Sequence, residues 1–500
     1  MDERDEVATT EEETAEEKAD RRAEDTAAPT SPLDRYFGIT AAGSSVKTEV
    51  IAGFTTWMTM AYILFVNPSI LGAVPDRDGL SLAFPLVLTS TALAAAVSTL
   101  AMGLIAKYPF AIAAGLGLNA VVAFQLVAGG GLSWPEAMGV IVTEGLIILV
   151  LVLTGFREAV MNAIPLALKQ AIGVGIGLFI AFIGFINAGF VGKPETPTLL
   201  VELGRGGELR GLPVAVFVIG LLLTAYLVAR GIRGALLIGI LGTTVFAILL
   251  NELFAGGNGW PESLPSAAQF PERVVAFPAG ENFSLIGDFS FGYFGRLGAI
   301  AAILAVFTIM LSDFFDTMGT VVGLGAKAGY LDADGRLPRS RQVLLVDSAA
   351  AAVGGAFSAS SNTTYIESAS GISEGGRTGL TATVVGLLFL VSVFLWPLAD
   401  VIPPQATAPA LIIVGFLMME IIREIPFERH ELGIPAFLTM VVMPFTFSIT
   451  NGVGAGFVSY TVIKLLRGEA RDVHWMMYLS SAAFVIYFAI YYVRSAFGVG

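Results

Sequence analysis

Cysteine is absent from this 500-residue chain, and histidine occurs only as His430 and His474. Without cysteine, the chain can form no disulfide and offers no thiolate for metal binding or nucleophilic catalysis. Neither histidine lies inside an apolar run, so we expect both in loops or at interfaces and predict no metal centre. Charged residues are also scarce, at 14% of the chain against about 25% in soluble globular domains. Hydrophobic residues make up 55% and the mean hydropathy is +0.77, which indicates an integral membrane protein.

The apolar residues form continuous runs rather than alternating patterns, which predicts membrane-spanning helices and not a β-barrel. Seven runs are followed by a polar stretch rich in proline and glycine at 252–295, then by seven more runs and one left over. We therefore predict an all-α polytopic membrane protein. The runs cover residues 51–71, 81–105, 112–128, 134–154, 160–188, 213–229, 234–251, 297–325, 343–356, 364–378, 379–402, 408–423, 433–449, 451–466 and 475–493.

The first 34 residues carry 13 acidic and four basic residues without apolar periodicity, so we predict a disordered tail at 1–32. The tail has no basic region followed by an apolar core and is not a signal peptide. With the N-terminus in the cytoplasm, most basic residues fall in cytoplasmic loops, as the positive-inside rule requires. In the short loops of the other side, at 72–80, 129–133 and 403–407, the only basic residue is Arg77. The pattern leaves open whether the run 475–493 spans the membrane or lies along its interface.

Two of the segments, 110–128 and 357–378, are too short or too polar for plain spanning helices. Each begins with small residues that favour extended backbone and becomes helical only afterwards, and each is the third segment of its group of seven. Matching interrupted segments in two halves indicate an inverted-repeat transporter with its site at mid-membrane. Seven segments, an odd number, give the two repeats opposite orientations. We place the repeats at about 48–251 and 297–467, within a transporter domain at 33–470 that is followed by a hydrophobic segment at 471–500.

Four carboxylates, Asp313, Asp316, Asp347 and Glu367, lie among apolar residues between positions 308 and 379. A carboxylate at membrane depth costs roughly 2.5–3.5 kcal/mol on insertion scales, so such residues usually line a substrate or ion path. Asp313 and Asp316 share a helix face, and two carboxylates that close do not both ionise easily away from water. One of them can then carry a proton near neutral pH, or the pair can accept N–H groups of a planar heterocycle. The alternative is that these residues cap a broken helix or bond to a neighbouring one.

The interrupted segments supply further candidates for contacts with a substrate. Gly117 allows close approach of the backbone, Asn119 can both donate and accept hydrogen bonds, and Thr364 adds a hydroxyl. The unpaired N–H groups at the start of each half-helix are expected to face a cavity. Glu144, Lys169 and Glu420 also fall in or near apolar runs, where we interpret them as interhelical pairs or as side chains that reach the interface.

Several stretches are similar to those of one transporter family: DRYFGIT (34–40), TEVIAGFTTWMTMAYILFVNP (48–68), AAGLGLNA (113–120), SDFFDTMGT (312–320) and SSNTTYIESASGISEGGRTGL (360–380). The chain resembles the AzgA-like guanine, hypoxanthine and adenine permeases of the nucleobase–cation symporter-2 family over residues 33 to about 470. The resemblance implies the uracil-permease fold, with fourteen segments, a core domain, a gate domain and short strands in segments 3 and 10. It also implies elevator-type transport, often by a homodimer.

The same resemblance implies roles for the candidate residues. Asp313 and Glu367 bind the purine, Gly117 and Asn119 line the site together with Thr364, and Asp316 serves transport or proton coupling. Asp347 matches an acidic position that keeps the core domain in order. No catalytic residue, cofactor or nucleic-acid partner is implied; the coupling ion is a proton, and the protein is a multi-pass protein of the cytoplasmic membrane.

Other functions remain as alternatives. An anion permease of the sulfate type shares this fold but usually carries a soluble C-terminal domain and has no use for several carboxylates. A uracil or xanthine permease would share the site chemistry. A membrane prenyltransferase would use aspartate-rich motifs to hold Mg²⁺ and diphosphate, but the only second motif here, LDADG (331–335), lies on a polar loop.

Overall fold

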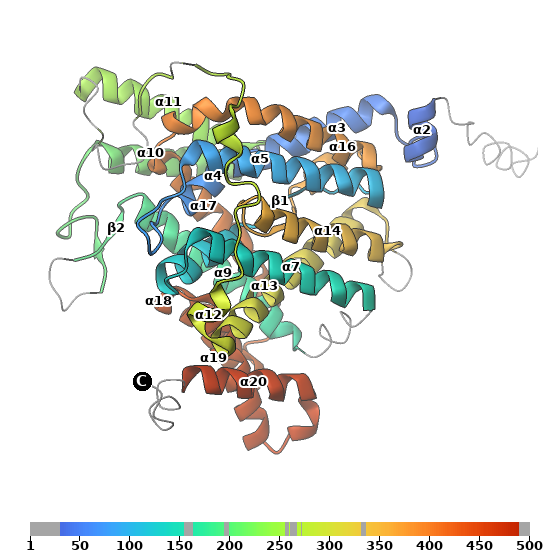
Figure 1. Cartoon of the computed structure of the whole chain (residues 1–500), viewed down its shortest axis with the longest axis vertical. Coiled ribbons are helices and arrows are strands. Elements are labelled where there is room, and N and C mark those ends of the chain that lie inside the picture. The colour runs from blue at the N-terminus through green and yellow to red at the C-terminus, as the bar shows by residue number, and fades with distance from the viewer. Residues whose placement is uncertain are drawn as a thin grey trace, which may run out of the picture.

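A computed structural model describes residues 31–154, 164–194, 200–255, 260, 268–271, 273–331 and 337–489. The predicted tail therefore lies outside the described residues up to position 30, and so does the end of the last apolar run from position 490. Among the described residues, nine helices are long and apolar enough to cross a membrane. Most helices run in one common direction, so the bundle has two ends (Figure 1). We call them the α2 end, after α2 (Pro32–Phe37), and the β2 end, after β2 (Val191–Gly192) and its partner β3 (Glu202–Leu203).

The helices pack into two groups. Bundle A consists of α3 (Val46–Met60), α4 (Ile63–Leu71), α5 (Phe84–Ala101), η1 (Met102–Ala106), α7 (Trp134–Thr154), α13 (Ala299–Ala328), α14 (Ser340–Ala356) and α16 (Gly379–Ser392) with η4 (Val393–Val401). Bundle B consists of α9 (Leu166–Asn187), α10 (Leu212–Ala229), α11 (Ala235–Ala255), α17 (Pro404–Met418) with η5 (Met419–Glu424), α18 (His430–Thr446) and α19 (Ile449–Leu466). The predicted polar stretch 252–295 contains η3 (Gly280–Phe283) and the start of α12 (Tyr293–Leu297).

Two interrupted segments meet inside bundle A. The first consists of β1 (Ile112–Ala114), α6 (Leu116–Ala120) and the π-helical η2 (Val121–Gly129), and the second of β4 (Asn362–Thr364) and α15 (Ser368–Ser373). The strands pair antiparallel, with Ala113 opposite Thr363. Segments some 250 positions apart in the chain are thereby joined by backbone hydrogen bonds.

Side chains complete the hydrogen bonding of this small sheet, as buried backbone at membrane depth requires. On the outer side of β1, the Ile112 N–H donates to Thr99 Oγ1 over 2.9 Å. On the outer side of β4, the Thr364 N–H donates to Asp347 Oδ1 over 3.0 Å. The chain reaches β4 through a tight reversal after α14, where Gly354 has no room for a side chain because a Cβ atom would lie 2.1 Å from the Ser360 carbonyl oxygen.

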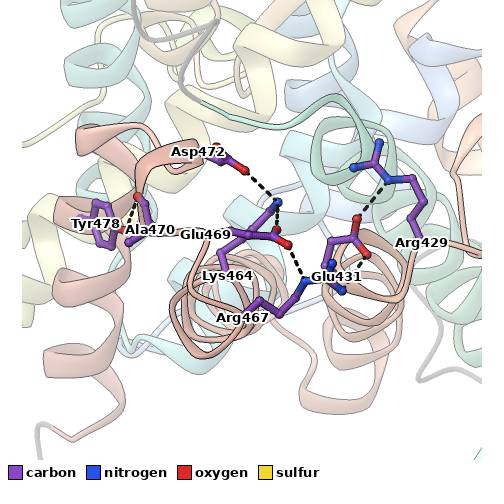
Figure 2. A network of polar contacts seen from close by, with 8 residues as sticks. All are labelled: Arg429, Glu431, Lys464, Arg467, Glu469, Ala470, Asp472 and Tyr478. Atoms are coloured by element: carbon purple, nitrogen blue, oxygen red, sulfur yellow. Dashed lines mark hydrogen bonds and ion pairs between the residues drawn. The ribbon is translucent and has the colours of Figure 1, made fainter.

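The last described helix, α20 (Trp475–Phe488), runs antiparallel along α19. Thr461 hydrogen-bonds to Ser481 over 2.7 Å, and further along the pair Phe457 packs edge to face against Phe484, with 5.9 Å between ring centroids. In Figure 1, α20 lies parallel to α5 and α7 rather than across them. A charged network holds its start at the α2 end, where Lys464 and Arg467 bind Glu469 and the Tyr478 hydroxyl donates to the carbonyl of Ala470 (Figure 2).

Candidate functional site

A polar stripe on α13 faces the paired strands of the interrupted segments. Asp313, Asp316, Thr317 and Thr320 follow the i, i+3, i+4, i+7 spacing of one helix face. Thr317 ties the stripe to the strands: its hydroxyl lies 2.9 Å from that of Thr363 in β4 and 2.7 Å from Asp347 Oδ2 in α14. The stripe is therefore held against β4 by hydrogen bonds between neighbouring elements.

A cavity of about 90 Å³ lies beside this stripe, between bundle A and α17 of bundle B. Its polar wall comes from bundle A, where Asp316 is exposed to the cavity and Glu367 is half-buried. Val414 and Met418 of α17 form an apolar wall. The full lining consists of Tyr62, Gly115, Leu116, Gly117, Asp316, Thr320, Thr363, Thr364, Tyr365, Ile366, Glu367, Val414 and Met418.

Glu367 is positioned by a tyrosine from a different helix. The hydroxyl of Tyr62, the residue directly before α4, donates to Glu367 Oε1 over 2.7 Å. Tyr62 is fully buried, and a buried tyrosine hydroxyl needs such a partner. The neighbouring Tyr365 donates its hydroxyl to the carbonyl of Ala114, which holds the second interrupted segment against the first. One oxygen of Glu367 is thus oriented by the protein, at the edge of the cavity.

Asp347 does not reach the cavity and satisfies the strand instead. It accepts hydrogen bonds from the Thr364 N–H and hydroxyl, at 3.0 and 2.7 Å, and from the Thr317 hydroxyl at 2.7 Å. These contacts join α13, α14 and β4 at a single carboxylate.

The structure separates the other predicted residues into those on the cavity wall and those behind it. Gly117 and Thr364 line the cavity, and Gly117 lies so close to α9 that a Cβ atom there would approach Ile176 Cγ2 to 2.5 Å. Asp313 and Asn119 are buried and are not among the residues that line the cavity. Neither polar atom of the Asn119 amide has a hydrogen-bond partner among the described residues.

Sequence reasoning missed several residues of this region. Tyr62 lies in an apolar run, where a tyrosine is usually an ordinary core residue, and only its contact with Glu367 distinguishes it. Val414 and Met418 carry no signal at all, because an apolar wall looks like any other helix face. Glu144 was interpreted as an interhelical pair; in the structure it is fully buried beside Asp313 and within 3.4 Å of the Ser361 hydroxyl. The position of this carboxylate near the centre of an apolar run is the signal that indicates a functional role.

A larger cavity of about 260 Å³ lies toward the β2 end, between η2, α13, the α18–α19 turn and α20. Its polar groups already bind one another across the two bundles: Gln125 donates to the Thr450 hydroxyl and accepts from the Ser448 hydroxyl at 3.3 Å. No carboxylate is among its lining residues. We therefore place the candidate substrate site at the smaller cavity.

The described part of the chain is a multi-pass membrane protein in which two interrupted helices meet at a cavity, an architecture found in transporters. The chain belongs to the xanthine/uracil permease family, described as "Permease family", whose pattern it matches over residues 47–455. It is accordingly a permease and not an enzyme.

Relatives of this chain match over nearly their whole lengths. The guanine/hypoxanthine permease PbuG of Bacillus subtilis is 38% identical over 91% of this chain and 99% of its own. The adenine permease AdeP of Escherichia coli is 40% identical over 91% of this chain and 95% of its own. A putative permease of Methanocaldococcus jannaschii is 41% identical over 91% of this chain and 98% of its own.

Solved structures with similar folds include those of anion transporters. The transmembrane domain of the cyanobacterial bicarbonate transporter BicA superposes with a TM-score of 0.58 at 13% identity, covering 82% of this chain and 97% of that domain. Murine Slc26a9 in its inward-facing state gives 0.57 at 11% identity, covering 90% and 75%. At such identities the likeness concerns the fold alone.

Proposed function

We propose that this protein imports purine nucleobases by proton symport and that bundle A moves against bundle B during transport. In this proposal, bundle A is the core domain and bundle B is the gate domain. The helices and the two interrupted segments together make up the fourteen segments of the expected fold. The relatives named above as guanine/hypoxanthine and adenine permeases support the substrate class.

The observation that carries the proposal is the one-sided chemistry of the cavity. Bundle A offers the carboxylates of Asp316 and Glu367, which accept hydrogen bonds, while bundle B offers only Val414 and Met418 to the cavity. A purine presents N–H donors on its edge and apolar faces, so its edge can bind the carboxylates while a face lies against the apolar wall. Because the polar contacts come from one bundle alone, the base can travel with that bundle. The geometry favours Asp316 over Asp313 as the direct partner of Glu367, since Asp313 lies behind the wall.

Uptake of labelled bases in a host without its own permeases tests the proposal. We expect uptake of hypoxanthine, guanine or adenine, and we expect a protonophore to abolish it. Uracil or sulfate uptake without purine uptake would overturn the substrate class. Purine uptake that survives the protonophore but requires sodium would instead overturn proton coupling and leave the substrate class intact.

The orientation of the chain belongs to the same proposal: the α2 end faces the cytoplasm. Since α20 runs from the α2 end along α19 toward the β2 end, it continues across the membrane rather than along its surface. The chain has no cysteine, so single cysteines can report this directly. A cysteine at Ala489 should react with an impermeant maleimide added outside intact cells, as should a control at Gly280, whereas one at Ser45 should not. Labelling of position 489 only after lysis would refute the crossing.

A further inference from the structure

Glu144 is a buried carboxylate that the substrate cavity does not include. It lies near the middle of α7, where α13 and α14 pack against it, and it is fully buried. The Ser361 hydroxyl lies 3.4 Å from Glu144 Oε2. The other neighbour is the carboxyl group of Asp313 on α13, which lies within hydrogen-bonding reach of Glu144.

A hydrogen bond between two carboxyl groups requires a proton. Ionised carboxylates are acceptors only, so two of them cannot bond unless one becomes a donor. Glu144 Oε1 and Asp313 Oδ1 find no protein donor among the described residues, although both side chains are at most 1% exposed. No ion pair to either residue occurs in the described part of the chain. Two unpaired charges at this depth would cost several kcal/mol each.

We propose that Glu144 and Asp313 hold one proton between them and that this pair, behind the substrate site, is the proton-binding site of the transporter. The coupling role of the pair rests on the proposed function of the protein as a transporter. The shared proton is inferred independently, from the contact between the two carboxyl groups.

The pair can act on the substrate site through α13. Asp313 and Asp316 are neighbours on one helix face, with Cβ atoms roughly 5–6 Å apart. Release of the shared proton adds a negative charge at that distance from Asp316, and this charge opposes ionisation of Asp316. The charge of the cavity wall that holds the base therefore differs between the protonated and the deprotonated pair. Glu144 is therefore a positioning residue for coupling and not a residue that touches the substrate.

The charged and titratable groups that face the pair come from every neighbouring element. Asp347 of α14 and Asp316 of α13 are acidic, and both raise the cost of a second charge. The Ser361 hydroxyl, just before β4, donates to Glu144 Oε2. The described surroundings of the pair thus hold acids and hydroxyl groups, which favour retention of the proton.

Glu144→Gln separates a coupling role from a structural one. The glutamine amide supplies its own N–H donor to Asp313, so the contact survives without the proton. In proteoliposomes that hold a pH-sensitive dye, we expect wild-type protein to acidify the lumen during purine uptake. The variant should still take up purine down its gradient, with acidification reduced roughly tenfold and a pH optimum shifted by about one unit. The matched control is Glu136→Gln on the same helix, whose ion pair with Arg77 lies far from the pair; it should acidify as wild type does.

Each result has a distinct meaning. No purine uptake by wild type would refute the proposed function, and purine uptake by wild type without acidification would refute proton symport. Normal acidification and pH optimum in Glu144→Gln would refute the present inference alone. If Glu144→Gln fails to fold, infrared spectroscopy of the wild-type protein in detergent at neutral pH tests the inference instead. A carbonyl band of a protonated carboxyl that is absent from Asp313→Asn supports the pair, and no such band in wild type overturns it.

Discussion

Two groups of charged residues in this protein differ in how their charges are balanced. At the α2 end of bundle B, acids and bases alternate in one network of Arg429, Glu431, Arg467, Glu469, Lys464 and Asp472 (Figure 2). Inside bundle A, five carboxylates lie on neighbouring elements, at Glu144, Asp313, Asp316, Asp347 and Glu367, and hydroxyl groups donate to three of them, Glu144, Asp347 and Glu367. No lysine or arginine forms an ion pair with these five in the part of the chain that the structure describes.

The difference shows which group serves the fold and which serves transport. A balanced network near the membrane surface stabilises its neighbours modestly and requires no other partner. An acidic group without cations is costly at membrane depth and is retained where a proton or a substrate supplies what the protein lacks. The balanced network should therefore affect stability and leave transport intact, whereas the acidic group should do the reverse.

The largest expected effect is at the cavity wall. Asp316→Asn and Glu367→Gln each remove an acceptor that the purine needs, so we expect uptake to fall by more than tenfold, or about 1.4 kcal/mol of binding. Melting temperatures in detergent should stay equal or rise, because an unbalanced charge at membrane depth is removed. Uptake and thermal unfolding measured on the same preparations check both halves. Wild-type uptake by either variant, or a marked loss of stability in both, would remove the distinction between the two groups.

The next effect concerns Asp347, the acid of this group to which we assign neither substrate nor proton. It accepts hydrogen bonds from Thr317 and Thr364. In Asp347→Ala, the Thr364 N–H at the edge of β4 loses its acceptor, and a buried donor left unpaired costs about 1–3 kcal/mol. We expect lower thermal stability and lost uptake together, in contrast to Asp316→Asn. Unchanged melting of Asp347→Ala would show that another group or water satisfies the strand.

The region of the site could be predicted from the sequence, but the separate roles of Asp316 and Asp347 could not. The long apolar runs predicted the helical membrane class, and the carboxylates at 313, 316, 347 and 367 pointed to the region of the site because a carboxylate at membrane depth is costly and usually lines a substrate or ion path. The sequence could not tell which acid faces the cavity, since Asp313 and Asp316 lie on the same helix face. That outcome depends on Glu144 of α7, which packs behind Asp313.

Contacts between distant segments were likewise beyond the sequence. The bond from Tyr62 to Glu367 joins residues 305 positions apart, and the pairing of β1 with β4 joins residues at a similar separation. Neither follows from a local pattern, because only packing decides which buried tyrosine meets which acid. The apolar wall of Val414 and Met418 is invisible for a related reason: every spanning helix has such a face.

A smaller effect is expected in the balanced network. Lys464 has 8% side-chain exposure and bridges Glu469 at 2.5 Å and Asp472 at 3.7 Å, which are both more exposed. Lys464→Met keeps the length of the side chain but removes the charge, while Arg467 still binds Glu469. We expect a loss of up to about 1 kcal/mol in stability and normal purine uptake. The exposed pair of Arg210 and Glu208 provides a control, since Arg210→Gln should change neither quantity.

Loss of uptake in Lys464→Met at normal stability would contradict the division of roles. It would mean that the start of α20 takes part in the movement of the bundles and does not merely hold the helix in place. Normal uptake with a reduced melting temperature keeps the network on the side of the fold.

The smallest effect is a dependence on pH at Glu469, which lies beyond the end of α19. Hydrogen bonds from Lys464 and then Arg467 lower the pKa of this carboxyl below its usual value in the unfolded chain. A lowered pKa contributes stability above the unfolded value of about 4.3, and the contribution is lost as the pH falls through the folded value. The melting difference between wild type and Glu469→Gln should thus be present at neutral pH and vanish in acid. The matched control Glu420→Gln, at an exposed acid without an ion pair among the described residues, should show no such trend. A difference that persists at a pH well below 4 would mean that the carboxyl stabilises the turn by its shape rather than its charge, and the balanced network would lose its electrostatic explanation.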